Sequence, residues 1–149
     1  MHYTNNTKRG FTLVELLIVI VVIAILAAIS IVAFNGVQQR GRDSARQSDV
    51  SNIIKAMTAY TADDGSWPAS AAAAKTALED YSTANLGAAI TDRITDQEPA
   101  PTDSDTRNRY QYTPLCTSGA PSGALITWFK EQDNSTPDAT AGTGDPCTP

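Results

Sequence analysis

The sequence predicts an α+β fold in which one long N-terminal helix precedes a small C-terminal domain with a short antiparallel sheet. Three observations predict this fold. The 19 residues from Leu16 to Phe34 include 18 apolar residues and no charged one. No proline precedes Pro68, so no proline can interrupt a helix before that position. Alternating apolar residues, which are typical of strands, occur in two stretches after residue 108.

The long helix is predicted over residues 11–62 and has two halves of different character. Its first half is apolar on every side, which suits a helix in a bilayer or inside a bundle of helices. Its second half is amphipathic, because apolar residues recur there at helical spacing between charged ones. This apolar stripe consists of Val50, Ile53, Ile54, Met57 and Tyr60 or Thr61. A helix of this length extends about 78 Å, so a small domain can cover only part of it.

The end of the long helix is predicted within residues 63–68. Gly65 can adopt the left-handed conformation that follows a helix, and Pro68 cannot continue one. Ser70 is a suitable N-cap for a short helix over residues 71–81.

Beyond this short helix the pattern is weaker. Leu86, Ile90 and Ile94 suggest one or two further helical turns. The composition of residues 97–107 predicts a loop.

Two strands are predicted in the C-terminal part, over Arg109–Thr113 and Ala124–Lys130. The Pro/Gly/Ser-rich stretch 114–123 between them permits a long hairpin. A two-stranded hairpin is only marginally stable alone, so we expect the apolar stripe of the long helix to cover it. The remaining polar residues, 132–149, are expected to be held in place by Cys147.

Composition limits the chemistry that this chain can perform. It has 11 basic and 16 acidic residues, a net charge of −5, and its one histidine is His2. A general nucleic-acid surface is therefore not expected, nor is a catalytic triad or a histidine metal site. We predict no enzymatic activity and no cofactor.

The two cysteines, Cys116 and Cys147, lie far beyond the apolar segment. They lack CxxC spacing and have no histidine partner, so a structural disulfide is the better interpretation. A disulfide places the residues after about 35 in an oxidising compartment.

The segment Lys-Arg-Gly-Phe-Thr-Leu-Val-Glu-Leu-Leu at residues 8–17 resembles the class III signal of type IV pilins and pseudopilins. The resemblance covers residues 8–35, and Tyr60–Pro68 looks like the helix end of the same family. It implies that a membrane prepilin peptidase cuts between Gly10 and Phe11, and that the new N-terminus at Phe11 is methylated. It also makes Glu15 the acidic residue on which filament assembly depends.

The resemblance implies three segments. Residues 1–10 would be a leader peptide, residues 11–35 a transmembrane and filament-core helix, and residues 36–149 the amphipathic helix half with an extracytoplasmic domain. Many members of the family have glycine and proline where this chain has Ala24 and Val32. We therefore expect an unbroken helix from about Leu13 to beyond Phe34.

Glu15 also has a physical explanation that is independent of the family. A carboxylate costs about 2.5–3.5 kcal/mol at the centre of a membrane span and less near its end. The free amine created at Phe11 of a neighbouring subunit can compensate this carboxylate. An alternative is that Glu15 is only a residue at a helix N-terminus, where the macrodipole favours an acid.

The expected function is that of a structural pilin: a single-pass membrane precursor that assembles into a helical, extracellular type IV pilus for adhesion, motility or DNA uptake. Its expected partners are further copies of itself, the prepilin peptidase, the membrane assembly machinery and, before assembly, the lipid bilayer. The first alternative is a pseudopilin of a type II secretion or competence system. A further alternative is a membrane-anchored minor tip subunit or binding module, and an ordinary secretory signal or anchor is a third.

Two weaker signals also have competing interpretations. Arg40, Arg42 and Arg46 could contact lipid headgroups, DNA or acids of neighbouring subunits, and the interleaved Asp43 and Asp49 favour a solvated or intersubunit ion-pairing face. The stretch 133–138 contains oxygen ligands for calcium but lacks an ordered loop signature, so no metal site is assigned.

Overall fold

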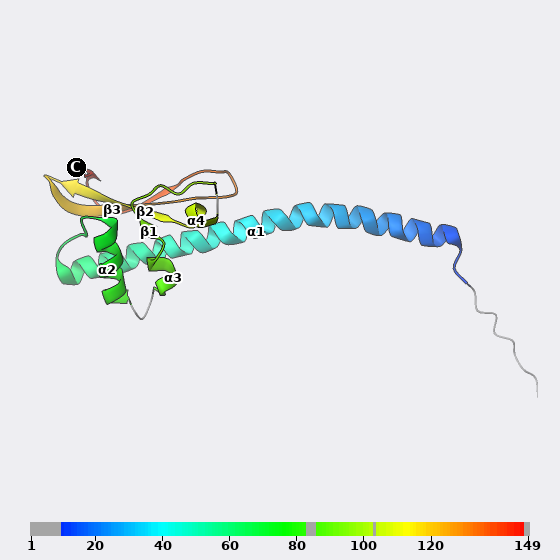
Figure 1. Ribbon diagram of the computed structural model, residues 1–149, viewed down its shortest axis with the longest axis horizontal. Helices are drawn as coiled ribbons and strands as arrows, with labels where there is room; N and C mark the ends of the chain where they lie inside the picture. The colour runs from blue at the N-terminus through cyan, green and yellow to red at the C-terminus, as the bar shows by residue number, and fades with distance from the viewer. Residues whose placement is uncertain (1–9, 83–85, 103, 148–149) are drawn as a thin grey trace, which may run out of the picture. The chain divides into compact units, whose positions relative to one another are not determined.

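The computed structural model describes residues 10–82, 86–102 and 104–147 (Figure 1). The predicted leader therefore lies outside the described residues except for Gly10. Residues up to Gln38 and residues from Gln39 onward form two separate compact units. Each unit is described by itself below.

Helix α1 (Leu13–Asp64) is continuous over 52 residues, which confirms the prediction of an unbroken helix. It passes Ala24 and Val32 without interruption because neither residue removes a backbone hydrogen-bond donor. The helix ends where expected. Gly65 adopts the left-handed conformation, with φ 79°, and its N–H donates to the carbonyl of Thr61 at 2.9 Å.

The short helix α2 (Ala71–Ser82) also matches the prediction, and the Ser70 hydroxyl accepts the N–H of Ala73 at 3.2 Å. The next segment was only partly predicted. A single turn, α3 (Ala88–Thr91), follows, but Ile94 lies in strand β1 (Ile94–Thr95) instead of a helix. A second short turn, α4 (Ser104–Arg107), interrupts the predicted loop.

Strands β2 (Tyr110–Thr117) and β3 (Ala120–Trp128) form an antiparallel hairpin that is longer than the predicted one. Residues 114–123, which had been expected to connect two shorter strands, lie almost entirely within it. Only Ser118 and Gly119 turn the chain, with φ of 54° and 81°. Two successive positive φ values are those of a type I′ turn, whose twist matches that of the flanking strands.

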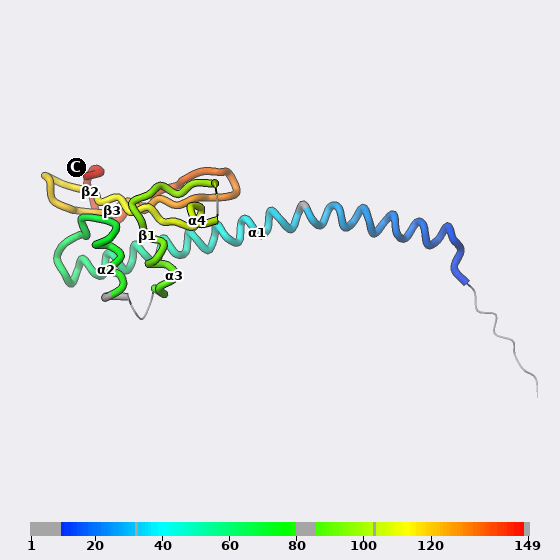
Figure 2. Tube along the Cα trace, in the orientation of Figure 1, coloured from blue at the N-terminus to red at the C-terminus, as the bar shows by residue number. Residues whose placement is uncertain are grey.

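Three further strands complete the sheet, whose main order is β1-β2-β3-β4. Strand β1 pairs with the start of β2 in parallel, and β4 (Asp138–Gly142) pairs with β3. Strand β5 (Asp145–Pro146) pairs with the end of β2. The chain trace in Figure 2 shows these C-terminal strands beside the hairpin. The tail after residue 132 is therefore part of the sheet, which composition alone did not indicate.

The core of the second unit lies between the sheet, helix α2 and the amphipathic half of α1, as the apolar stripe predicts. Val50, Ile53 and Met57 of α1 are buried together with Tyr110 and Tyr112 of β2. The Tyr112 hydroxyl donates to the carbonyl of Pro68 at 2.7 Å, and the Tyr110 hydroxyl donates to Asp49 at 2.7 Å. Burial raises the pKa of both tyrosines, so both remain neutral donors.

Candidate functional site

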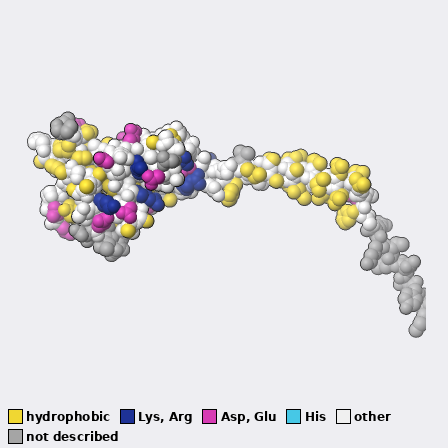
Figure 3. Space-filling model, in the orientation of Figure 1, with side chains coloured by type: hydrophobic (Ala, Val, Ile, Leu, Met, Phe, Trp, Pro, Cys, Tyr) yellow, Lys and Arg dark blue, Asp and Glu magenta, His cyan; other side chains and the backbone are white. Residues whose placement is uncertain are grey.

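The apolar half of α1 is the most unusual surface of the molecule. Every large apolar side chain described from Leu13 to Val37 is between 48% and 82% exposed. Hydrophobic side chains line the face of this half that Figure 3 shows. Among the described residues, α1 is the one helix long and apolar enough to cross a membrane. Soluble monomers rarely expose so large an apolar surface, so something other than the residues that the structure describes must cover it.

The start of this helix is stabilised by a reciprocal cap between Thr12 and Glu15. The N–H and the hydroxyl of Thr12 both donate to Glu15 Oε2 at 2.8 Å, and the Glu15 N–H donates to Thr12 Oγ1 at 3.2 Å. This is a capping box, in which two of the free N–H groups of a helix start are satisfied. The Thr-x-x-Glu spacing at residues 12–15 is its sequence signature, although the predictions from the sequence do not include this cap.

The other residues expected at this end are also exposed. Gly10 and Phe11 precede the first helical residue, and the Phe11 side chain is 89% exposed. Apart from its chain neighbours, no heavy atom of the described residues lies within 4 Å of the position where a Cβ would stand on Gly10. The described residues therefore leave the bond between Gly10 and Phe11, where cleavage is predicted, accessible. Glu15 contacts Thr12 of the same chain.

The predicted disulfide between Cys116 and Cys147 is present, with a Cα–Cα distance of 5.0 Å. It joins β2 to the end of the described chain. The N–H of Cys147 also donates to the carbonyl of Pro114 at 3.0 Å. The bond therefore fixes β5 and the tail against the sheet, at the opposite end of the sequence from the apolar helix.

Two of the three arginines that follow the apolar half form ion pairs within the second unit. Glu131 accepts from Arg42 at 2.7 Å and from Arg46 at 2.6 Å, and Arg46 also binds Asp43 at 3.0 Å. Arg42 and Arg46 therefore form their ion pairs within the chain, whereas the sequence had suggested a solvated face or ion pairs with neighbouring subunits. The two guanidinium groups lower the pKa of the Glu131 carboxyl to about 2.

Asp43 has a second role in this cluster. Its carboxylate accepts the N–H groups of Glu131 and Gln132 at 2.8 and 2.9 Å. It therefore holds the loop after β3 against α1. Sequence reasoning could not find this contact, because Glu131 lies 88 residues away from Asp43 along the chain.

The candidate calcium stretch has other partners in the structure. Asp133 accepts from Lys130 at 2.6 Å and from the Ser135 hydroxyl at 2.5 Å. Within the described ranges, no three His, Cys, Asp or Glu side chains are grouped so that they could hold a metal ion.

Comparison with known proteins finds a family model that matches the N-terminal part of this chain, and relatives that are similar to less than half of it. Residues 5–31 match the family model described as the prokaryotic N-terminal methylation motif. Fimbrial protein EcpC of Eikenella corrodens is 41% identical over 70 residues, which is 47% of this chain and 46% of that protein. Type IV major pilin protein PilE1 of Neisseria gonorrhoeae is 36% identical over 64 residues, or 43% of this chain and 39% of that one.

A third relative, type IV wide pilus major component PilA4 of Thermus thermophilus, is 38% identical over 68 residues, which cover 46% of this chain and 52% of that protein. The alignments thus span about half of the length of these relatives, or less. No solved structure matches this chain. The similarity shows the methylation motif and relates the N-terminal part of the chain to type IV pilins.

Proposed function

We propose that this chain is a structural subunit of a type IV pilus, made as a membrane-anchored precursor and assembled into an extracellular filament. In this proposal a prepilin peptidase removes residues 1–10, and the new N-terminus at Phe11 is methylated. Residues 11–35 anchor the precursor in the bilayer and then form the filament core, while residues 36–149 remain outside the cytoplasm. The membrane assembly machinery and further copies of the chain are the partners.

One observation carries the proposal: the apolar half of α1 is exposed, and its single acid, Glu15, lies in the first turn of the helix, four residues after Phe11. The exposed surface needs a cover, and a bilayer and a bundle of identical helices are both apolar covers. The motif match over residues 5–31 and the pilin relatives support this assignment.

The capping box suggests how Glu15 serves both environments. In the bilayer, Thr12 satisfies the Glu15 carboxylate within the same chain, which reduces the cost of a polar group there. In the filament, the carboxylate accepts the Phe11 amine of a neighbouring subunit. A charge-assisted bond to an amine is stronger than a bond to a hydroxyl, so this exchange favours assembly.

Three variants test the proposal by immunoblot of membrane and sheared-filament fractions. Gly10→Val should block cleavage and leave uncut precursor in the membrane. Glu15→Ala should be inserted and cleaved, yet give little or no filament, because the amine of the neighbour is left unpaired in an apolar core.

Glu15→Gln separates the two roles of this residue. Glutamine retains the hydrogen bond to Thr12, since Glu and Gln both serve in capping boxes, but it carries no charge. We expect Glu15→Gln to lose filaments as Glu15→Ala does. Normal filament yield from either variant would show that the acid only caps the helix, and would contradict its role in assembly.

The runner-up function, a pseudopilin of a secretion or competence system, shares the helix and the processing. The relatives named as pilus and fimbrial proteins favour the pilus. Purified surface filaments analysed by mass spectrometry distinguish the candidates. Long surface filaments built from this chain support the pilus, and surface filaments that lack this chain support the pseudopilin. A chain found only in trace amounts at filament tips supports a minor binding subunit.

A further inference from the structure

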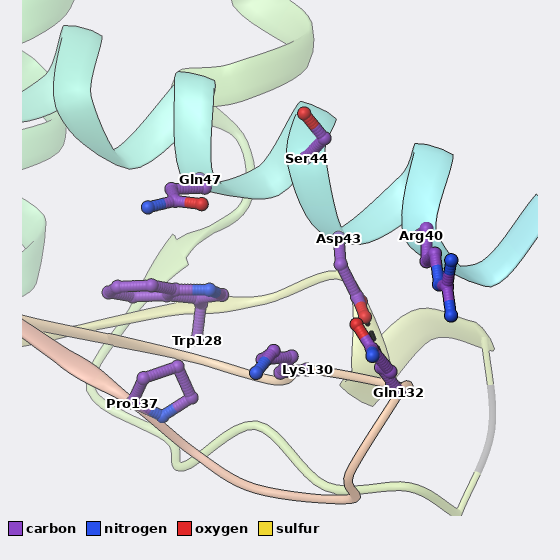
Figure 4. A pocket seen from close by; sticks show the side chains of 8 residues that line it. All are labelled: Arg40, Asp43, Ser44, Gln47, Trp128, Lys130, Gln132 and Pro137. Atoms are coloured by element: carbon purple, nitrogen blue, oxygen red, sulfur yellow. Dashed lines mark hydrogen bonds between the residues drawn. The ribbon is translucent and has the colours of Figure 1, made fainter. Parts of the chain in front are cut away.

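A cationic hollow lies between α1 and the loop that follows β3. Its lining includes Arg40, Asp43, Ser44 and Gln47 from the helix and Lys130 and Gln132 from the end of the sheet, and its volume is about 390 Å³. Figure 4 shows these two groups of side chains on the facing elements. All of these residues belong to the second unit. The hollow therefore combines two cations and one carboxylate with hydroxyl and amide groups.

The carboxylate in this hollow is already engaged. Asp43 Oδ1 accepts from Arg46 and from the Glu131 N–H, and Asp43 Oδ2 accepts from the Gln132 N–H. Lys130 is paired with Asp133. The Arg40 guanidinium, in contrast, has no hydrogen bond or ion pair to any residue that the structure describes. An exposed guanidinium over donor groups is suited to a phosphate group, because its planar N–H groups match phosphate oxygens.

The position of Arg40 in α1 indicates where such a phosphate would come from. Arg40 follows Val37, the last exposed large apolar residue of the helix, by three residues or about 4.5 Å of helix rise. The headgroup layer on each side of a bilayer is about 5–7 Å thick. When the apolar half spans the membrane, Arg40 reaches the depth of the lipid phosphates.

We propose that this hollow binds the phosphate group of an anionic phospholipid in the leaflet where the helix leaves the membrane. The inference rests on the membrane anchor of the proposed function and adds a specific lipid partner to it. Overall negative charge, −5 for the chain, disfavours a general attraction to an anionic surface. Binding must therefore depend on the local cations, of which Arg40 is the free one.

Full-length chain in detergent micelles, titrated with phosphatidylglycerol or with phosphatidylcholine, tests the proposal by native mass spectrometry. We expect tighter binding of phosphatidylglycerol. Arg40→Gln should weaken it about fivefold, the usual effect of one cation near an anionic surface, and leave phosphatidylcholine binding unchanged.

Lys55→Gln is the matched control. Lys55 is also an exposed cation of α1 with no bond to the described residues, but it does not line the hollow. This variant removes the same charge and should bind phosphatidylglycerol as the unaltered chain does. If the two substitutions weaken phosphatidylglycerol binding equally, the effect comes from net charge alone, which would overturn the site.

Other outcomes distinguish the alternative occupants. Inorganic phosphate that displaces phosphatidylglycerol at equal concentration would show a free-phosphate site and overturn the lipid assignment. Unchanged lipid binding of Arg40→Gln together with a loss of filaments would assign Arg40 to a contact with a neighbouring subunit.

Membrane fractionation keeps the two proposals separate. A chain recovered in the membrane without a preference for phosphatidylglycerol overturns only the lipid site. A chain absent from the membrane fraction overturns the anchor as well.

Discussion

The two halves of helix α1 have the same secondary structure and opposite environments. In the first half, Ile23 is 58% exposed, and its apolar neighbours are exposed to a similar degree. In the second half, Ile53 is fully buried against the sheet. The difference shows that the second half is covered by other parts of its own chain, whereas no residue in the described part of the chain covers the first half.

This contrast predicts opposite effects for one substitution made in each half. Ile53→Asp should strongly destabilise the second unit, because an unpaired carboxyl group in its core costs several kcal/mol, a large part of the about 5–15 kcal/mol that stabilise a typical domain. Ile23→Asp should leave that unit folded and instead reduce insertion and assembly. Near-UV circular dichroism of the full chain in detergent, with membrane fractionation, measures both effects. Equal loss of tertiary signal from the two variants would contradict the contrast.

The second largest effect should come from the disulfide of the second unit. Cys116 and Cys147 are 31 residues apart, for which the loop-entropy model gives about 3.7 kcal/mol of stabilisation. We expect Cys116→Ser with Cys147→Ser to lower the free energy of unfolding by about that amount in denaturant titrations. The apolar half should be unaffected, so insertion should remain normal. Two free thiols in non-reducing peptide mapping of the unaltered chain would contradict the bond itself.

The ion pairs of Glu131 with Arg42 and Arg46 should respond to pH. Glu131 has its pKa lowered from 4.5 to about 2 by Arg42 and Arg46, so the folded state holds its proton less tightly than the unfolded state. The stability from this group is therefore complete above about pH 4.5 and disappears as the pH falls toward 2.

Glu131→Gln should lower the free energy of unfolding by about 3 kcal/mol at neutral pH, because Arg46 loses a buried partner. It should also flatten the acid limb of the stability curve. Thermal unfolding followed from pH 7 to pH 2 measures both. An unchanged acid limb would show that other carboxylates determine the pH dependence.

The smallest predicted effects concern two glycines: Gly41 within α1, and Gly65 directly after its end. Gly41→Ala should stabilise the helix by about 1 kcal/mol, because the position is helical and open. Gly65→Ala should destabilise by about 1 kcal/mol, since its φ of 79° strains any residue with a Cβ. Denaturant midpoints of the two variants should move in opposite directions. Shifts of the same sign would contradict the assigned helix end.

The sequence predicted those features that depend on neighbouring residues. Helix α1 follows from its apolar run and its spacing, and its end follows from Gly65 and Pro68. The capping box between Thr12 and Glu15 is equally local and could have been recognised from its spacing.

Features that join distant residues were not predictable in the same way. Pro114 and Gly123 argue against strands by composition, yet both lie in the hairpin, and Pro114 lies between the segments of β2 that pair with β1 and β5. The parallel pairing of Ile94 and the contact of Glu131 with Arg42 join segments that are far apart in sequence. A single sequence contains the residues of such contacts but not their pairing.

We propose that the exposed apolar half of α1 becomes the core of a filament after processing. Mass spectrometry of sheared, purified surface filaments tests this proposal. We expect the chain to be a main component, with Phe11 as its first residue and one methyl group on the Phe11 amine. A filament preparation without this chain, or a chain that still contains residues 1–10, would contradict it.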